Sequence, residues 1–164
     1  ITEERKSIIL QVSAGEHTLQ LYVENIGRIT YGPEILDNSK GLFGSIALSD
    51  TEIENWRMIP LLVRDCAVGE LAFVPQTGGG LPCFYKGIFT VETPEEIYLD
   101  VSGWGMGEVW VNGHYAGSYW EQNAQQSIQL PVEVLQKGAN SLIVFELKSN
   151  GKRTMYLSNK AVFN

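Results

Sequence analysis

The apolar residues of this chain recur mainly with a period of two, and this pattern constrains the fold more than any other feature. Successive side chains of a strand point to opposite faces, so the period is typical of strands with one buried face. Leu19, Leu21 and Val23 alternate with polar neighbours, and no segment has the pattern of a long amphipathic helix. The sequence therefore predicts an all-β protein, an antiparallel β-sandwich or jelly roll.

Turn signals separate the expected strands. Asn112-Gly113 supplies two positive-φ positions and predicts a tight hairpin, and residues 13–16 predict a turn between two earlier strands. Residues 131–137 predict one short helical turn that ends at Gly138. The expected strands are residues 8–12, 18–24, 42–48, 56–62, 85–91, 97–101, 109–115, 127–130 and 142–147.

A segment rich in glycine and proline divides the chain. Residues 73–82 contain two prolines and the run Gly78-Gly79-Gly80, which favours neither a ladder nor a helix. We expect a linker over residues 65–80, with one group of strands in residues 1–64 and another in residues 81–164.

Composition excludes several kinds of partner. The net charge of −7 repels phosphate backbones, so nucleic acid is not an expected partner. No apolar stretch approaches the roughly 20 residues needed to cross a bilayer, so no membrane partner is expected. Cys66 and Cys83 do not form a zinc-ligand pattern; a disulfide between them and two free thiols both remain open.

Catalytic patterns are absent from the sequence. Glycoside cleavage needs two carboxyl groups roughly 5–10 Å apart across a sugar pocket, and no pair stands out. His17 and His114 lack ligand-like neighbours, and no nucleophile signature is present. We therefore expect no catalytic residue, metal or cofactor. The carboxylates considered are Glu24, Asp37, Asp65, Glu95, Glu96, Asp100 and Glu108.

Aromatic residues give the one binding hypothesis. Trp104, Trp110, Tyr119 and Trp120 crowd the region around the hairpin, and sugar rings stack on such side chains. By alternation Trp110 shares a face with Glu108, which could make that face polar enough for a ligand. The alternative interpretation is that these aromatics fill the core or an interface.

Residues 103–107, Gly-Trp-Gly-Met-Gly, resemble a phosphate loop only superficially. A strand follows them in place of a helix whose N-terminus could bind an anion. We interpret the glycines as a tight connection between strands, with Trp104 as a plug in the core.

Two blocks of sequence resemble family 35 glycoside hydrolases, the β-galactosidases. The first runs from Leu21 to Gly32 and continues through Asp37 and Lys40-Gly41; the second comprises residues 82–89, 103–113 and 117–120. The second block is similar to that family's C-terminal β-domains, and the resemblance extends over about residues 19–147.

The resemblance implies a galactose-binding-domain-like fold and a retaining β-galactosidase as the parent activity, with both catalytic acids on a barrel that this chain lacks. Residues 1–64 would be the C-terminal part of a first β-sandwich and residues 81–164 a second sandwich. The alternative is a free-standing carbohydrate-binding module for galactosides. The implied partners are the parent's barrel, or another chain that completes the first sandwich, and galactosides. The family favours a periplasmic or extracellular location.

Overall fold

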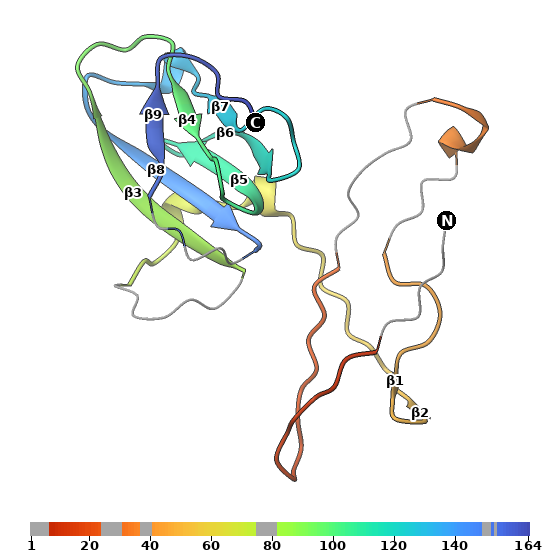
Figure 1. Cartoon of the computed structure of the whole chain (residues 1–164). Coiled ribbons are helices and arrows are strands. Elements are labelled where there is room, and N and C mark those ends of the chain that lie inside the picture. Colours follow the sequence, from red (N-terminus) through yellow and green to blue (C-terminus); the bar gives the residue numbers. More distant parts are fainter. Residues whose placement is uncertain (1–6, 24–30, 37–40, 75–81, 149–151, 153) are drawn as a thin grey trace. The chain divides into compact units, whose positions relative to one another are not determined.

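The computed structural model describes residues 7–23, 31–36, 41–74, 82–148, 152 and 154–164. It divides into two compact units, residues 1–58 and residues 59–164, here called unit 1 and unit 2. All sheets pair antiparallel, and the described helical segments are short 3-10 turns (Figure 1). The predicted all-β class is confirmed. No helix of the described residues is long and apolar enough to span a membrane.

Unit 2 is built from two sheets. The first has four strands in the order β3-β8-β5-β6, and the second has three in the order β7-β4-β9. We call them sheet B and sheet C. The strands of sheet B are β3 (Cys83–Val91), β5 (Met106–Val111), β6 (His114–Trp120) and β8 (Gly138–Glu146), and those of sheet C are β4 (Tyr98–Asp100), β7 (Ser127–Gln129) and β9 (Tyr156–Ser158).

The turn signals of unit 2 predicted the hairpin and the helical turn correctly. Asn112 and Gly113 have φ values of 50° and 83°, which close the β5–β6 hairpin. The helical turn expected after Pro131 is η4 (Val132–Val134), and Gly138 follows it with a φ of 95°. The expected strand 109–115 is wrong as a single strand, because the turn at Asn112-Gly113 divides it between β5 and β6. Residues 116–120 of β6 and the strand β9 were not predicted.

The main core lies between the two sheets. Val109 and Val111 on β5 point into it, and Leu99 on β4 meets them from sheet C. Alternation explains this set, because every second residue of each strand faces inward. The buried members are Leu99, Val101, Trp104, Val109, Val111, Tyr119, Ile128, Leu130, Leu135 and Val144.

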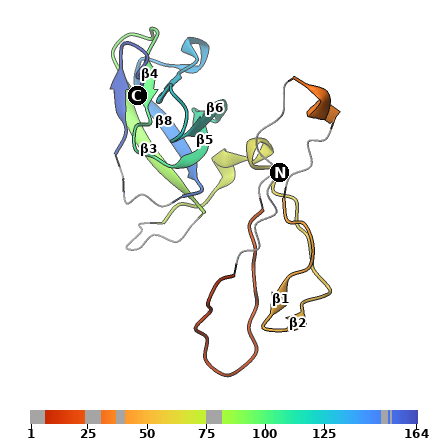
Figure 2. The ribbon, with the colours of Figure 1, turned by 45° about the vertical axis from the view of Figure 1, so that its right-hand side comes forward.

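The opposite face of sheet B is covered in part. Trp110, Ile143 and Phe145 point away from the main core and form a second buried cluster. The segment that covers them contains two 3-10 turns, η2 (Val63–Asp65) and η3 (Val68–Glu70), which Figure 2 shows beside β5 and β6. The residues of this segment in the cluster are Val63, Cys66, Val68, Leu71 and Phe73.

We call residues 63–73 the strap. Much of the strap falls in the stretch 65–80 that was expected as a linker, yet its Val68 is buried in the second cluster. Apolar residues at intervals along the strap account for this, because each finds a partner on the outer face of sheet B. Residues 75–80 of the expected linker lie outside the described residues.

Unit 1 has little pairing among its described residues. It contains η1 (Pro33–Leu36), β1 (Ala47–Leu48) and β2 (Thr51–Glu52), and the two strands pair with each other. Residues 7–23 run out and back around a bend at residues 14–15, where His17 Nε2 bonds the Ser13 carbonyl at 2.8 Å. The predicted turn is therefore present, but the described residues around it form no ladder.

The strands predicted over 8–12, 18–23 and 56–62 are thus wrong for the described residues, and that over 42–48 reduces to β1. The physical reason is that alternation specifies a face to bury, not the partner that buries it. A two-stranded hairpin without a covering layer is marginal in water. Residue 24 lies outside the described residues.

Among the described glycines of unit 2, Gly107 has the least room for a side chain. A Cβ there would overlap the Phe145 carbonyl oxygen and lie 2.6 Å from the Tyr119 hydroxyl. We expect Gly107→Ala to lower the unfolding free energy of unit 2 by more than about 3 kcal/mol, measured by thermal and denaturant unfolding. Gly87→Ala is the matched control, because nothing lies within 4 Å of its added Cβ, and it should change stability by less than about 1 kcal/mol. Equal effects of the two substitutions would contradict this packing.

Candidate functional site

The glycine-rich segment 103–107 wraps a buried carboxylate of the chain itself. Glu146, at the end of β8, is 1% exposed. Its oxygens accept hydrogen bonds from the backbone N–H groups of Gly105 and Met106, both at 3.1 Å, and of Lys148 at 2.7 Å. The Tyr119 hydroxyl donates a fourth at 3.0 Å. The segment therefore holds an anion, but an internal one.

One row of residues across sheet B explains this arrangement. Glu146 pairs with Gly107, and Gly107 pairs with Tyr119. Because Gly107 has no side chain, the Tyr119 ring can lie across β5 and reach Glu146 on β8. Burial, and then the nearby carboxylate, raise the pKa of Tyr119. The hydroxyl therefore stays protonated and remains a donor.

Two asparagines, Asn112 and Asn140, fix the hairpin turn through hydrogen bonds. Asn112 Nδ2 donates to the Val134 carbonyl at 2.7 Å and to Asn140 Oδ1 at 2.8 Å. Asn112 Oδ1 accepts from the Ser141 N–H at 2.8 Å. Asn140 is itself buried and bonds the backbone of residues 136 and 138. Asn112 thus serves both the turn conformation and the attachment of the hairpin to β8 and η4.

The strap is attached to β5 and β6 by a polar cluster. Arg64 Nε lies 3.3 Å from Glu108 Oε1, and its guanidinium carbon lies 5.3 Å from the Tyr115 ring centroid. The Tyr115 hydroxyl donates a short hydrogen bond to the other Glu108 oxygen. Partial burial, and then the bond to Glu108, raise the pKa of Tyr115 to about 12. The Glu108 carboxylate also raises the pKa of Arg64.

The predicted sugar-binding aromatics are not brought together on one surface. Trp104 and Tyr119 are buried in the main core, and Trp110 is buried beneath the strap. Trp104, Tyr119 and Trp110 thus fill the core, as the alternative interpretation of the sequence has it. The polar partner expected beside Trp110, Glu108, faces Arg64.

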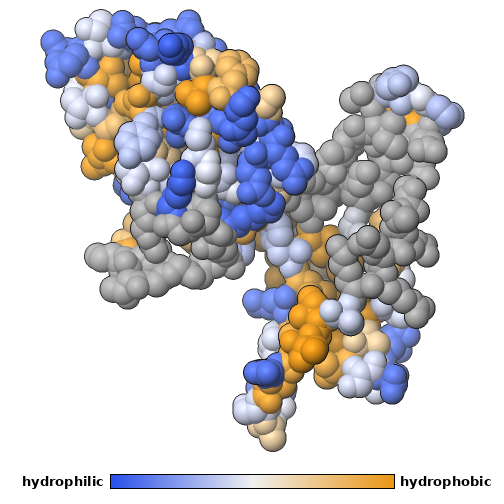
Figure 3. Space-filling model, in the orientation of Figure 1, coloured by the Kyte–Doolittle hydropathy of each residue, from blue (hydrophilic) through white to orange (hydrophobic). Residues whose placement is uncertain are grey.

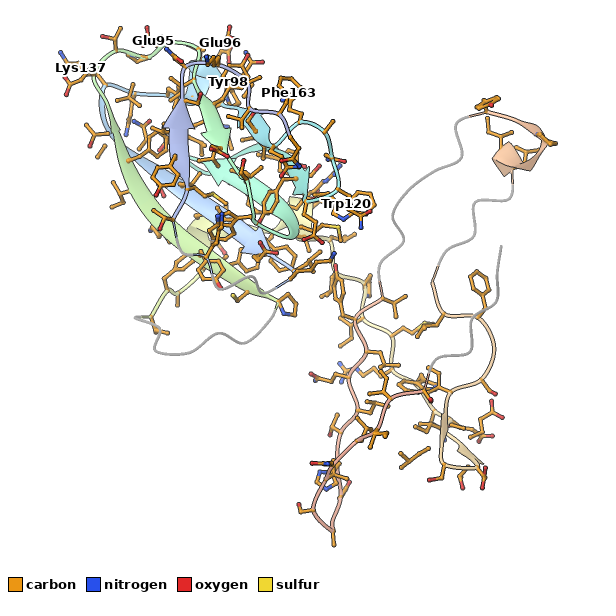
Figure 4. The ribbon with its side chains drawn as sticks, in the orientation of Figure 1. Glu95, Glu96, Tyr98, Trp120, Lys137 and Phe163 are labelled. Carbon is orange, nitrogen blue, oxygen red and sulfur yellow. The ribbon has the colours of Figure 1, made fainter. Side chains whose placement is uncertain are left out.

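Trp104 and Trp120 differ in their surroundings. The Trp104 ring packs edge-on against Tyr85 at 5.6 Å, and its Nε1 donates to the Thr154 carbonyl at 3.1 Å. Trp120, at the end of β6, is half-buried (Figure 4), and its indole N–H is enclosed without a hydrogen-bond acceptor among the described residues. Trp120 is therefore the one member of the predicted set with a partly exposed ring.

The other candidate residues are placed apart. Glu24 and Asp37 lie outside the described residues. Asp65 is exposed on η2, Glu96 accepts from the Tyr98 hydroxyl at 2.6 Å, and Asp100 accepts from the Ser102 N–H at 2.8 Å. The histidines His17 and His114 are both exposed. Among the described residues, no group of three or more His, Cys, Asp or Glu could hold a metal ion.

Glu95 lines an open hollow between the end of β3 and the start of β4. Glu92 lines the same hollow, and both glutamates are exposed to solvent. The lining residues are Thr90, Val91, Glu92, Thr93, Glu95, Ile97 and Leu157.

The two cysteines are free and half-buried. Cys66 packs in the second cluster beside Phe84, on the outer face of sheet B. Cys83 precedes Phe84 on β3, so its side chain points to the inner face. The sheet separates the two thiols, so of the two states left open by the sequence the structure has two free thiols and no disulfide.

Sequence reasoning missed Glu146 and Arg64 as organising residues. A signal for Glu146 was available, because it is the one acidic residue within the otherwise apolar run 142–147 and needs donors if that strand is buried. Arg64 had no local signal, since its partners are far along the chain.

The contacts of Glu146 predict that replacing one of its carboxylate oxygens with an NH₂ group will lower the stability of unit 2. In Glu146→Gln an NH₂ group replaces one acceptor oxygen and confronts backbone N–H donors, so unit 2 should lose about 2 kcal/mol or more of stability in denaturant unfolding. Glu121→Gln removes an exposed ion pair between Glu121 and Lys148, whose Oε1 and Nζ atoms lie 2.7 Å apart. This substitution should lower the unfolding free energy by less than about 1 kcal/mol. Comparable losses in the two variants would contradict the role of Glu146.

Tyr115 predicts an alkaline loss of stability. Its folded pKa, about 12, lies above its ordinary value of 10.0, so the unfolded chain releases the phenol proton first. The stabilisation is complete below about pH 10 and is lost as the pH rises toward 12. Tyr115→Phe does not titrate, so its unfolding free energy should fall less steeply over that window. If the unfolding free energies of the two proteins fall in parallel over this pH range, the titration of Tyr115 does not contribute to the alkaline loss of stability.

Comparison with known proteins places this architecture in a family. Residues 82–140 match the family described as "Beta-galactosidase, galactose-binding domain", and residues 1–62 match "Beta-galactosidase, first all-beta domain".

The chain is also similar to complete curated proteins. It is 34% identical over 145 residues to human "Beta-galactosidase-1-like protein 2", covering 85% of this chain and 23% of the relative. It is 32% identical over 169 residues to "Beta-galactosidase" of Bos taurus (88% and 26%) and 33% identical over 129 residues to "Beta-galactosidase" of Xanthomonas manihotis (77% and 21%). The chain thus spans about a quarter of the length of these relatives, and it belongs to the β-galactosidase family, of which it holds non-catalytic β-domains.

Proposed function

We propose that this chain is the supporting β-region of a retaining β-galactosidase, which buttresses a catalytic barrel and contributes to subunit contacts. In this proposal the acid/base and nucleophile carboxylates stand on the barrel. The observation that carries the proposal is the uncovered apolar surface of unit 1, which requires a partner.

Unit 1 exposes far more apolar surface than its small size could keep stable in water. Ile9 and Met58 are each 91% exposed, and Figure 3 shows hydrophobic side chains gathered over the described part of this unit. Soluble proteins rarely leave large contiguous apolar patches uncovered. Large apolar residues at least 60% exposed in unit 1 also include Ile8, Val12, Tyr31, Leu36 and Phe43.

The same segments retain the sequence pattern of strands. Residues 18–23 alternate as a half-buried strand would, but in the described part of unit 1 only β1 and β2 pair. Unpaired N–H and C=O groups of extended segments are satisfied by neighbouring strands. We therefore propose that strands of the parent protein, or of another chain, complete this sandwich, and the match of residues 1–62 to an all-β domain family supports strands in this region.

Unit 2 differs because its own strands bury two apolar clusters. We propose the division into a first β-sandwich over residues 1–64, which is incomplete, and a second over residues 81–164. The packed strap favours a firm attachment between residues 63–73 and the second sandwich.

The two contexts of unit 1 can be compared with one substitution. Ile9→Asp should change the stability of this chain little, because the side chain is exposed. In the longer parent it should lower the melting temperature and the yield of active enzyme, because it would bury a carboxylate. Ile9→Val is the control and should be tolerated in both. A parent that tolerates Ile9→Asp as well as this chain does would contradict the proposal.

Activity gives the second test. On a chromogenic β-galactoside, the longer parent should release the chromophore and this chain should release none above the buffer rate. Turnover by these 164 residues alone would overturn the supporting role.

A further inference from the structure

One strand of sheet B has a long free edge. The strand order places β3 at the margin of the sheet, and β3 is its outermost strand in Figure 1. All nine residues of β3 pair with β8 without a register shift. Among the described residues, no strand pairs with the other edge of β3. The described part of sheet B therefore ends in a long, regular edge.

The ladder between β8 and β5 shows which backbone groups lie on that edge. The Asn112 N–H bonds the Ser141 carbonyl and the Leu147 N–H bonds the Met106 carbonyl, both at 2.9 Å, so the odd-numbered residues along β8 turn their backbone groups toward β5. The even-numbered residues of β8 turn theirs toward β3, where their partners are odd-numbered. The even-numbered residues of β3 therefore direct their N–H and C=O groups away from β8. These residues are Phe84, Lys86, Ile88 and Thr90.

The other edge strands of unit 2 have features that discourage pairing. Strand β6 has a register shift opposite Val109 and Trp110, and β7 and β9 have three residues each. Short edge strands and bulges commonly prevent pairing with another chain. Strand β3 has no proline and no register shift, and Lys86 is its one charged residue. Among the described strands of unit 2, β3 is thus the best suited to accept another strand.

The middle of β3 is open to solvent. Lys86, Gly87 and Ile88 are exposed, and the exposed fraction of Ile88 is 74%. A Cβ added at Gly87 would meet nothing within 4 Å. An approaching backbone can therefore reach the centre of the β3 edge, and burial of Ile88 against it would be favourable.

The backbone of β3 can pair with a second copy of itself. An antiparallel pair centred on Gly87 places Lys86 opposite Ile88 of the second copy, and Phe84 opposite Thr90 of that copy. These are the residues whose N–H and C=O groups point outward, so each such pair can exchange two hydrogen bonds. The register overlaps all nine residues of the strand.

The side chains favour the same register. Tyr85 lies opposite Phe89 of the second copy on the inner face, and the aliphatic stem of Lys86 covers Ile88 on the outer face. A register centred on Lys86 would place two lysine charges directly opposite each other, which is unfavourable. A register centred on Ile88 would pair only residues 85–91. The strand is therefore complementary to itself in one register.

We propose that the β3 edge is an interface between two copies of this chain, whose B sheets join at Gly87 into one continuous sheet. A symmetric dimer uses the same surface on both subunits, which a self-complementary strand supplies. The inference rests on the subunit contacts of the proposed function, for which it names a surface. The supporting role beside a barrel is tested separately, by activity and by Ile9→Asp.

Disulfide cross-linking of the full chain locates the interface. Opposed residues of a non-hydrogen-bonded antiparallel pair have Cα atoms about 4.5 Å apart, a distance that a disulfide can span. Gly87→Cys, combined with Cys66→Ala and Cys83→Ala, should therefore form a covalent dimer on mild oxidation with diamide. Gly69→Cys in the same background is the matched control, because Gly69 is also an exposed glycine of unit 2 with room for a Cβ. It should yield about tenfold less dimer.

Sedimentation velocity tests the strand pairing without a cross-link. The original chain should show a dimer fraction that rises with concentration. Ile88→Pro should leave unit 2 folded, because the N–H that proline removes points away from β8, and it should raise the dimer Kd about tenfold or more. Ile88→Val is the control and should retain the dimer. Near-ultraviolet circular dichroism verifies that each variant is folded, and the cross-link is measured independently of the proline variant.

Three outcomes would overturn the proposal. They are a monomer at every concentration, a dimer that folded Ile88→Pro retains, and equal cross-linking of the Gly87→Cys and Gly69→Cys variants. The second outcome would assign the association to another surface, such as the exposed apolar residues of unit 1. None of these results changes the activity expected of the parent, so a failure of this interface is distinguishable from a failure of the supporting role.

Discussion

The structure of unit 2 depends on the burial of one carboxylate. Glu146 ends the central strand β8, and it can remain inside the sandwich only because three backbone N–H groups and the Tyr119 hydroxyl surround it. That requirement favours glycine at 107, where a side chain would displace the Tyr119 ring, and at 105, where a Cβ would lie 3.0 Å from Glu146 Oε1. A motif that resembles an anion-binding loop is therefore a structural clasp between β5, β6 and β8.

Sheet B carries a buried apolar cluster on each face, and this sets unit 2 apart from a simple sandwich. Trp110 and Phe145 would form an exposed apolar patch without the strap, and Arg64 attaches the strap at its start through Glu108 and Tyr115. The side chains that first indicated a sugar platform are thus used for packing.

The sequence was informative where a signal and its partner are both local. Asn112-Gly113 predicted the hairpin, and alternation predicted the long strands β3, β5 and β8 of unit 2. The strand β9 was missed because Leu157 is the only aliphatic residue in its three positions. The strap was missed because Val68 and Phe73 meet partners more than thirty residues beyond η3, on β5 and β8, and no local period reports such a contact. In unit 1 the alternation of residues 18–23 specified an apolar face, but no described segment pairs with these residues.

The central claim is that unit 2 is stabilised by its own contacts whereas unit 1 awaits covering strands. Native-state hydrogen exchange on the full chain measures this directly, residue by residue. The account predicts strong protection of the amides of Gly105, Met106 and Lys148, which donate to Glu146, and fast exchange over residues 7–23. Protection of residues 7–23 equal to that of β5 and β8, or fast exchange at the three Glu146 donors, would contradict it.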